Sequence, residues 1–307
     1  MKNIYDVIII GSGPAGLTAA IYTGRDMLRT LVFAGAKWGG QLQLTTLIEN
    51  FPGFPEGVQG PDLMLAMRKQ AETCGAEIID RDVSKTDFSQ FPFRVMADGK
   101  EYNGKSVIIA TGTDTTWLGV PGEKEKIGRG VASCAPCDAP FYKNKKVIVV
   151  GGGNAAMEEA SILAKFAKEV NIVYRQEAFK RVSKMMLDEI KTNSKIKMIY
   201  SSEVIEILGK DKVEGVKLKN NKTGSISEMP IDGVFVAISR KPKSELFGQI
   251  EKDEKGFIKV HDQIKTNIEG VFAAGDIHNR VYQQAITAAG FGAMAALEVS
   301  LWLEGQK

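Results

Sequence analysis

Cysteine and histidine are scarce in this 307-residue chain, which has three cysteines and two histidines. A structural zinc site takes about four ligands. Beside the pair Cys134 and Cys137, the only candidate zinc ligands of these two types are Cys74, His261 and His278, and their spacing is not that of a zinc site. A zinc site is therefore the weaker interpretation of the pair, and we expect no metal.

An excess of charge of one sign and long apolar runs are also lacking. Lysine and arginine number 40 against 37 acidic residues, a net charge of +3, so no surface typical of nucleic-acid or membrane binding is evident. We find no apolar run approaching a membrane span, and no basic leader before the first strand. Few cysteines and no secretory signal predict a cytoplasmic protein. The length predicts two domains.

The segment Cys134-Ala-Pro-Cys137-Asp138 carries the clearest redox signal. A disulfide between residues three apart closes a loop too small to stabilise the fold much. The pair suits reversible opening and closing better, and a helix start is expected to acidify its first thiol.

A buried strand over residues 4–10 runs into Gly11-Ser-Gly13-Pro-Ala-Gly16 and then into a helix through Tyr22. This strand–turn–helix order is typical of a dinucleotide site. Gly11 makes the turn, Gly13 admits a pyrophosphate and Gly16 lets helix and strand pack. The acidic residue common at the end of the second strand is missing, since residues 31–33 are followed by Ala-Gly.

A second strand–turn–helix unit begins at residues 145–150 and continues as Gly151-Gly-Gly153-Asn-Ala-Ala156. Two such units in one chain predict two bound dinucleotides. The following strand, 170–174, precedes a basic cluster where a 2′-phosphate would be held. An ordinary solvated helix start is the alternative interpretation of that cluster. Its members are Arg175, Gln176, Lys180 and Arg181.

Other segments predict the remaining elements. We expect a long functional loop over 38–55, a helix from residue 61 that buries Cys74, a domain crossing near 118–122, and a strand over 270–274 that ends in a turn with an acid. Residues 196–238 are expected to form short strands with hairpin turns, and residues 282–303 a long amphipathic helix.

Taken together, the motifs resemble those of low-molecular-weight thioredoxin reductases of the bacterial and archaeal type, class II pyridine nucleotide-disulfide oxidoreductases. The matching stretches span nearly the whole chain. They are GSGPAGLTAA (11–20), GGQL (39–42), ENFPGFP (49–55), ATGT (110–113), CAPCD (134–138), GGGNAAMEEA (151–160), GVFAAGDI (270–277) and QAITAAGFGAMAAL (284–297).

The resemblance implies an α/β protein with two Rossmann-like domains, in which a nicotinamide domain (116–245) is inserted into a discontinuous FAD domain (1–115 and 246–307). It implies a homodimer and a thioredoxin-like protein as electron acceptor. The residues it assigns to FAD are Gly11, Gly13, Ala15, Gly16, Gly40, Gln41, Asn50, Thr111, Gly112, Gly275, Asp276, Gln284 and Ala285.

For the nicotinamide cofactor, NADPH with NADH as the alternative, the resemblance assigns Gly151, Gly153, Asn154, Ala156, Glu158, Arg175, Lys180 and Arg181. The chain departs from the family here. The family's His-Arg-Arg reads Tyr174-Arg-Gln176, an expected arginine is Lys180, and the Arg-Gln-Ala before the last helix reads Gln283-Gln-Ala. Lysine cannot hold a phosphate bidentately as arginine does, so the preference for NADPH is weakened.

By the same resemblance, Cys137 is the sulfur on the flavin side, Cys134 attacks the partner disulfide and Asp138 is the general acid. A helix-capping carboxylate is the alternative interpretation of Asp138. Three rival functions remain at this stage: a reductase driven by ferredoxin or a deazaflavin, a flavin-dependent dithiol oxidase, and a redox-sensing module without turnover.

Overall fold

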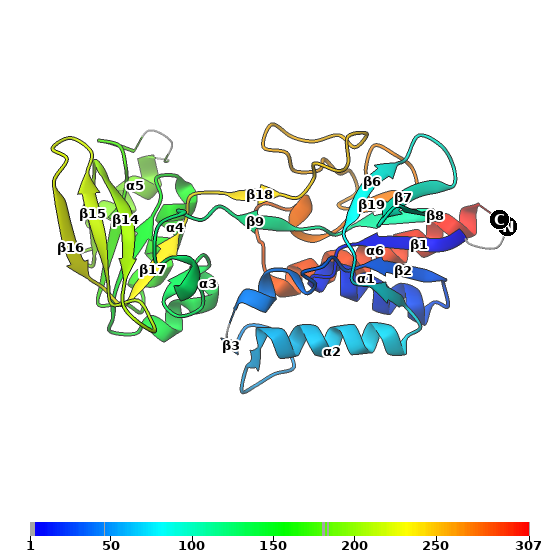
Figure 1. Cartoon of the computed structure of the whole chain (residues 1–307), viewed down its shortest axis with the longest axis horizontal. Coiled ribbons are helices and arrows are strands. Elements are labelled where there is room, and N and C mark those ends of the chain that lie inside the picture. The colour runs from blue at the N-terminus through cyan, green and yellow to red at the C-terminus, as the bar shows by residue number, and fades with distance from the viewer. Residues whose placement is uncertain (1–3, 46, 180–181, 183, 307) are drawn as a thin grey trace. The chain divides into compact units, whose positions relative to one another are not determined.

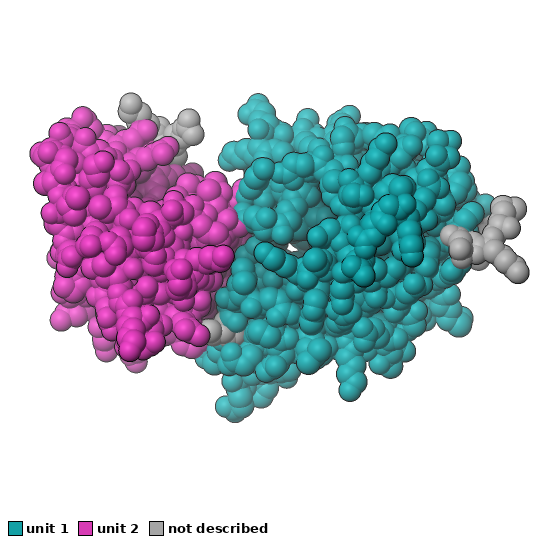
Figure 2. Space-filling view, in the orientation of Figure 1, with its two compact units in different colours: residues 1–114, 241–307 teal, residues 115–240 magenta. Residues whose placement is uncertain are grey.

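A computed structural model describes residues 4–45, 47–179, 182 and 184–306. The chain divides into two compact units, residues 1–114 with 241–307 and residues 115–240 (Figure 2). The sequence-based boundaries, after 115 and after 245, lie one and five residues further along. Strands β9 (Thr113–Thr115) and β18 (Arg240–Pro242) pair with each other where the chain passes between the units.

The first unit is built on a seven-stranded sheet in the order β5-β2-β1-β8-β7-β6, with β19 also paired to β8. β1, β2, β5, β8 and β19 run parallel, whereas β6 and β7 add an antiparallel branch. The strands are β1 (Ile4–Ile10), β2 (Thr30–Phe33), β5 (Glu77–Ile79), β6 (Val83–Asp87), β7 (Phe93–Ala97), β8 (Lys100–Ile109) and β19 (Val271–Ala273).

Helices cover one face of this sheet, and Figure 1 shows α1 and α6 running alongside β1. The other face packs against residues that follow the chain's return to this unit, among them Phe247 and Ile258. The helices are α1 (Pro14–Arg25), α2 (Gly60–Thr73) and α6 (Ala285–Gly305), with short 3₁₀ turns η1 (Gly40–Leu44) and η4 (Gly275–Ile277). The loop expected over 38–55 contains η1 and β3 (Leu47–Ile48), which pairs with β4 (Val58–Gln59).

Helix α6 corrects one expectation from the sequence. It is long and apolar enough, by length and composition, to cross a membrane, so the statement that no apolar run approaches such a span is wrong. Its small residues serve packing inside this unit. A side chain at Gly292 would run into the backbone of Ala15 in α1, so the two helices touch closely there.

The second unit has a five-stranded parallel sheet in the order β10-β17-β11-β12-β13. Helices α3, α4 and α5 pack on one face, and an antiparallel sheet β14-β15-β16 packs on the other. The elements are η2 (Lys124–Lys126), β10 (Val131–Ala132), α3 (Ala135–Asp138), η3 (Ala139–Tyr142), β11 (Lys146–Val150), α4 (Asn154–Ala164), β12 (Glu169–Val173), α5 (Lys184–Thr192), β13 (Ile196–Ile199), β14 (Ser202–Leu208), β15 (Gly215–Asn220), β16 (Ile226–Pro230) and β17 (Gly233–Val236).

The expected hairpins over 196–238 are therefore only partly correct. β14, β15 and β16 form the expected hairpins, whereas β13 and β17 are strands of the parallel sheet. A short apolar run does not indicate the direction of a strand. A strand buried on both faces has the same sequence pattern in a parallel sheet and in an antiparallel hairpin.

Candidate active site

The turn between β1 and α1 has the form that a dinucleotide site requires. Gly11 has φ of +116°, and a side chain on it would meet the carbonyl of Ala110. A side chain on Gly16 would meet the backbone of Gly11, whereas the space in front of Gly13 is open. The turn is therefore packed tightly on its inner side and open where the helix begins.

Residues from distant segments surround this turn. Gly40 lies against Gly13, with its hypothetical Cβ 3.3 Å from the Gly13 Cα. Gln41 Nε2 donates to the carbonyl of Thr113 at 2.9 Å. Ala15 packs against Gly275, which has φ of +82°.

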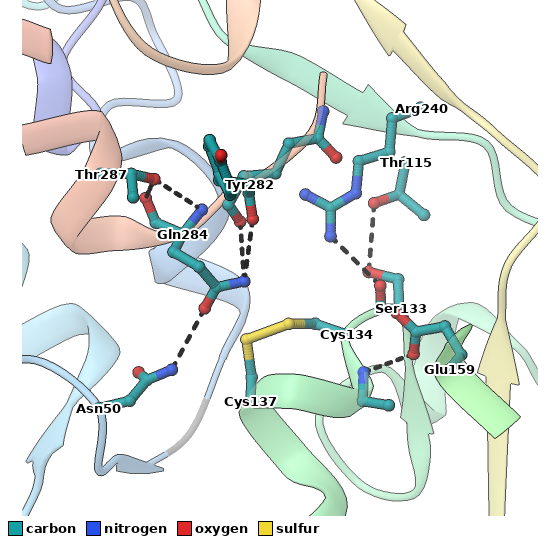
Figure 3. The surroundings of a disulfide bond; sticks show 12 residues. Asn50, Thr115, Ser133, Cys134, Cys137, Glu159, Arg240, Tyr282, Gln284 and Thr287 are labelled. Atoms are coloured by element: carbon teal, nitrogen blue, oxygen red, sulfur yellow. Dashed lines mark hydrogen bonds between the residues drawn. A yellow bond between two sulfur atoms is a disulfide. The ribbon is translucent and has the colours of Figure 1, made fainter. Parts of the chain in front are cut away.

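Further predicted residues lie on neighbouring loops of the same unit. Asn50 Nδ2 donates to Gln284 Oε1 at 3.2 Å, and Gln284 caps α6 through a reciprocal pair with Thr287 (Figure 3). Thr111 Oγ1 donates to the carbonyl of Lys243, and Gly112, with φ of +66°, faces open space. Asp276 is in η4 and Ala285 is the first residue of α6.

Two buried polar atoms have no hydrogen-bond partner among the described residues: Thr113 Oγ1 and His278 Nε2. Burial lowers the pKa of His278 to about 4, so its imidazole is neutral, and its ring packs edge-on against Phe291. Thr113 belongs to the same segment as Gly112 and bonds to Gln41 through its carbonyl. Such orphaned polar groups fit a site built for a polar ligand.

The second unit repeats the turn between β11 and α4. A side chain on Gly151 would meet the carbonyl of Ala237 and Ala156, while the space in front of Gly153 is open. Asn154 and Glu158 are exposed at the start of α4. This turn also fits a dinucleotide.

The residues after β12 differ from an arginine-rich phosphate site. Tyr174 lies over Gly152, stacks on Phe179 and donates from its hydroxyl to Gln176 Oε1 at 3.2 Å. Arg175 is exposed. The other two predicted cations, Lys180 and Arg181, lie outside the described residues.

Cys134 and Cys137 form a disulfide, with Cα atoms 5.4 Å apart. Cys134 is the N-cap of the four-residue helix α3, and its carbonyl accepts from the amides of Cys137 and Asp138. Burial raises the pKa of Asp138 to about 6. Asp138 is the N-cap residue of η3 but makes no side-chain capping bond to it, which leaves the carboxyl available for proton transfer.

Three residues of this region were missed by sequence reasoning. Glu159 in α4 accepts the amide of Ala135. Arg240 Nη2 donates to the carbonyl of Ser133 at 3.2 Å, and Ser133 Oγ lies 3.3 Å from Thr115 Oγ1 (Figure 3). The two adjacent glutamates after the second glycine turn are visible in the sequence. The hydrogen bond from the Ala135 amide to Glu159 is not, because it depends on the packing of α4 against α3.

Comparison with known proteins agrees with this layout. The family model for pyridine nucleotide-disulphide oxidoreductases matches residues 5–292. A curated thioredoxin reductase from Rickettsia felis is 48% identical over 309 residues, covering 99% of each chain. This chain belongs to the thioredoxin reductase family.

Two solved structures of that family are also similar. Thioredoxin reductase from Streptococcus pyogenes is 38% identical with a TM-score of 0.94, covering 99% of this chain and 100% of that one. A ferredoxin-flavin thioredoxin reductase from Clostridium acetobutylicum is 32% identical with a TM-score of 0.53, covering 98% and 99%. The α/β fold with two Rossmann-like units, predicted from the sequence, is confirmed for this thioredoxin reductase family member.

Proposed function

We propose that the protein is a flavin-dependent thioredoxin-disulfide reductase that carries electrons from a nicotinamide dinucleotide, through FAD, to Cys134–Cys137 and on to a thioredoxin-like protein. The observation that carries this proposal is the disulfide between residues three apart, placed in a unit with its own dinucleotide turn. Such a bridge contributes little to stability and is suited to cycling.

FAD is assigned to the first unit. Its pyrophosphate would lie at the open face of Gly13 and the start of α1, with Gly11, Ala15 and Gly16 shaping the turn. The residues that would hold the rest of the cofactor are Gly40, Gln41, Asn50, Thr111, Gly112, Gly275, Asp276, Gln284 and Ala285. The buried hydroxyl of Thr113, which has no hydrogen-bond partner among the described residues, is a tenth candidate beside these nine. FAD, when bound, would supply the acceptor for the nicotinamide hydride, a role that no side chain offers.

NADPH is the proposed donor, with NADH as the alternative. Gly151, Gly153, Asn154 and Ala156 would seat the pyrophosphate of either nucleotide, and Glu158 would help to position the nicotinamide. Selection of the 2′-phosphate would fall to Arg175, Lys180 and Arg181. Because Tyr174 and Gln176 bond to each other where the family has a histidine and an arginine, we expect a small preference for NADPH over NADH.

The dithiol formed on reduction would act through three residues. The Cys134 thiolate attacks the disulfide of the partner, giving a mixed disulfide and one partner thiolate. Cys137 then attacks the Cys134 sulfur, which restores the bridge and releases the reduced partner. Asp138, protonated below about pH 6, would donate a proton to the leaving thiolate. A homodimer, a cytoplasmic location and a thioredoxin-like acceptor remain predictions.

Ferredoxin is the second candidate donor, and two observations favour it. The similar enzyme from Clostridium acetobutylicum is named for ferredoxin, and this chain lacks two of the cations that the family uses for NADPH. The intact Gly151–Gly153 turn is the argument for a nicotinamide nucleotide instead.

Anaerobic reduction of the bound flavin tests the proposal directly. The purified protein is mixed with NADPH, NADH or reduced ferredoxin, and the flavin absorbance is followed by stopped flow. We expect fast bleaching by NADPH, slower bleaching by NADH, and thioredoxin reduction that is lost in Cys134→Ser. Bleaching by ferredoxin alone would support the second candidate, and a protein unable to bind flavin would contradict both.

A further inference from the structure

The two peptide groups that flank Cys134 are each held by a charged side chain. The carbonyl of Ser133 accepts from Arg240 Nη2 at 3.2 Å, and the amide of Ala135 donates to Glu159 Oε2. Figure 3 shows Glu159 and Arg240 reaching this segment from different elements, α4 and β18. Ala135 itself is fully buried, so its amide has no access to water in place of Glu159.

In helix α3, each backbone amide either donates a hydrogen bond or, at proline, is missing. Pro136 has no N–H, and the amides of Cys137 and Asp138 both donate to the carbonyl of Cys134. The amide of Ala135 is the first of the helix and goes to a carboxylate. The expected acidification of Cys134 by the helix start is therefore opposed, because a negative charge occupies the position where the amide would stabilise a thiolate.

Glu159 is surrounded by groups of both signs. Asp138 of α3 and Glu158 of α4 act against its ionised form, while Arg240 of β18 and the Ala135 amide favour it. Burial outweighs the favourable contacts and raises the pKa of Glu159 to about 7. Near neutral pH the carboxyl therefore exchanges its proton readily, and a new negative charge nearby would favour its neutral form.

We propose that Glu159 is a positioning residue for the redox pair, which fixes the Ala135 amide and takes up a proton when the Cys134–Cys137 disulfide is reduced. This inference rests on the proposed function only in requiring that the pair cycles. When dithiothreitol is the reductant, its own disulfide forms as the protein S–S bond breaks, and two electrons pass to the protein sulfurs. Of its two protons, one goes to a sulfur and the other is shared between the second sulfur and Glu159.

The test uses the purified holoenzyme with Glu159→Gln, whose amide oxygen still accepts from Ala135 but carries no charge. The protein is equilibrated in anaerobic dithiothreitol buffers, its thiols are trapped with iodoacetamide, and the peptide holding Cys134 and Cys137 is quantified by mass spectrometry. At pH 8 we expect the equilibrium to shift about tenfold towards the dithiol, which is about 30 mV for a two-electron couple.

Alkylation kinetics give a second measurement on the same samples. A thiol pKa lowered by about one unit raises the thiolate fraction up to tenfold but lowers its nucleophilicity, so the rate at pH 8 should rise about threefold. Both differences should vanish at pH 6, where Glu159 of the unmodified protein is itself neutral. No difference at either pH, or an equal offset at both, would overturn the inference.

Two further variants separate charge from position. Glu189→Gln removes an exposed charge from α5 of the same unit and should behave as the unmodified protein. Glu159→Ala leaves the Ala135 amide unsatisfied, so it should show the charge effect and a lower melting temperature than Glu159→Gln. Equal melting temperatures would exclude the positioning role. None of these measurements needs a nicotinamide or thioredoxin, so the result does not depend on the proposed electron donor or acceptor. If dithiothreitol cannot reduce the Cys134–Cys137 disulfide, the proposed function is contradicted as well.

Discussion

Asp138 illustrates how the surroundings of one residue set its chemistry. A carboxyl with an ordinary pKa of 3.8 would be ionised at neutral pH and unable to donate a proton, but burial raises this pKa to about 6. The residue therefore keeps a useful fraction of its acid form near neutral pH, as a general acid should.

This assignment predicts the pH dependence of turnover. The acid form of Asp138 dominates below about pH 6, so its contribution to kcat/KM for thioredoxin should be full there and be lost as the pH rises through 6. Asp138→Asn cannot donate a proton. It should lose about 10²- to 10⁴-fold in rate and also lose this part of the profile. A variant of unchanged rate would leave Asp138 as a structural residue only.

The two cysteines should differ in what they trap. If Cys134 attacks the partner, Cys137→Ser forms a mixed disulfide with thioredoxin that nothing resolves, so the covalent complex accumulates. Cys134→Ser should give no such complex. Non-reducing electrophoresis and mass spectrometry identify the bridged cysteine. A complex formed only by Cys134→Ser would reverse the assigned roles.

At the scale of elements, the glycines of α6 provide a matched pair. Gly292 faces the backbone of Ala15, whereas a side chain on Gly290 would meet nothing within 4 Å. Gly290→Ala should stabilise the helix by about 0.5–1 kcal/mol, because alanine loses less entropy on folding. Gly292→Ala should destabilise the protein by about 1–3 kcal/mol through overpacking. Thermal unfolding measures both, and equal effects of the two changes would contradict the close approach of α6 to α1.

The second glycine turn makes a functional prediction of the same kind. Gly153 has extended backbone and open space before it, so Gly153→Ala should fold normally and retain its flavin. The added methyl group would stand where the pyrophosphate is proposed to lie, and KM for NADPH should rise about tenfold or more. Gly13→Ala is the counterpart, and it should lower the flavin content instead. Steady-state kinetics and flavin absorbance separate the two, and an unchanged KM in Gly153→Ala would place the nucleotide elsewhere.

These elements also show where sequence reasoning succeeds and where it stops. The turns after β1 and β11 were predictable, because close backbone contacts there require glycine and the spacing of these glycines is visible in the sequence. The direction of β13 and β17 was not, since it depends on which neighbour each strand meets. The contact between Glu159 and Ala135 joins positions 24 residues apart, and no local pattern encodes it. The prediction of an amphipathic helix over residues 282–303 missed the apolar length of α6, whose many small residues pack against α1.

At the scale of the whole molecule, each unit has its own hydrophobic core. The buried clusters around β1 and β8 contain only residues of the first unit, and those around β11 and β17 only residues of the second. The chain leaves the first unit and returns to it through β9 and β18, which pair, so the two crossing points lie side by side. An insertion with this anatomy can be removed without opening the core of its host.

We therefore expect a protein in which residues 115–240 are replaced by a short Gly-Ser linker to fold and bind FAD. It should be yellow, with the flavin absorbance of the full chain, because every residue assigned to FAD stays in place. Neither NADPH nor thioredoxin should react with its flavin at the rate of the full chain, since the nicotinamide turn and the disulfide have been removed. The complementary piece, residues 115–240, should be colourless and should bind NADPH in calorimetry. A deletion protein that folds by circular dichroism but takes up no flavin would show that the inserted unit contributes to the FAD site, and the assignment of each cofactor to one unit would then be wrong.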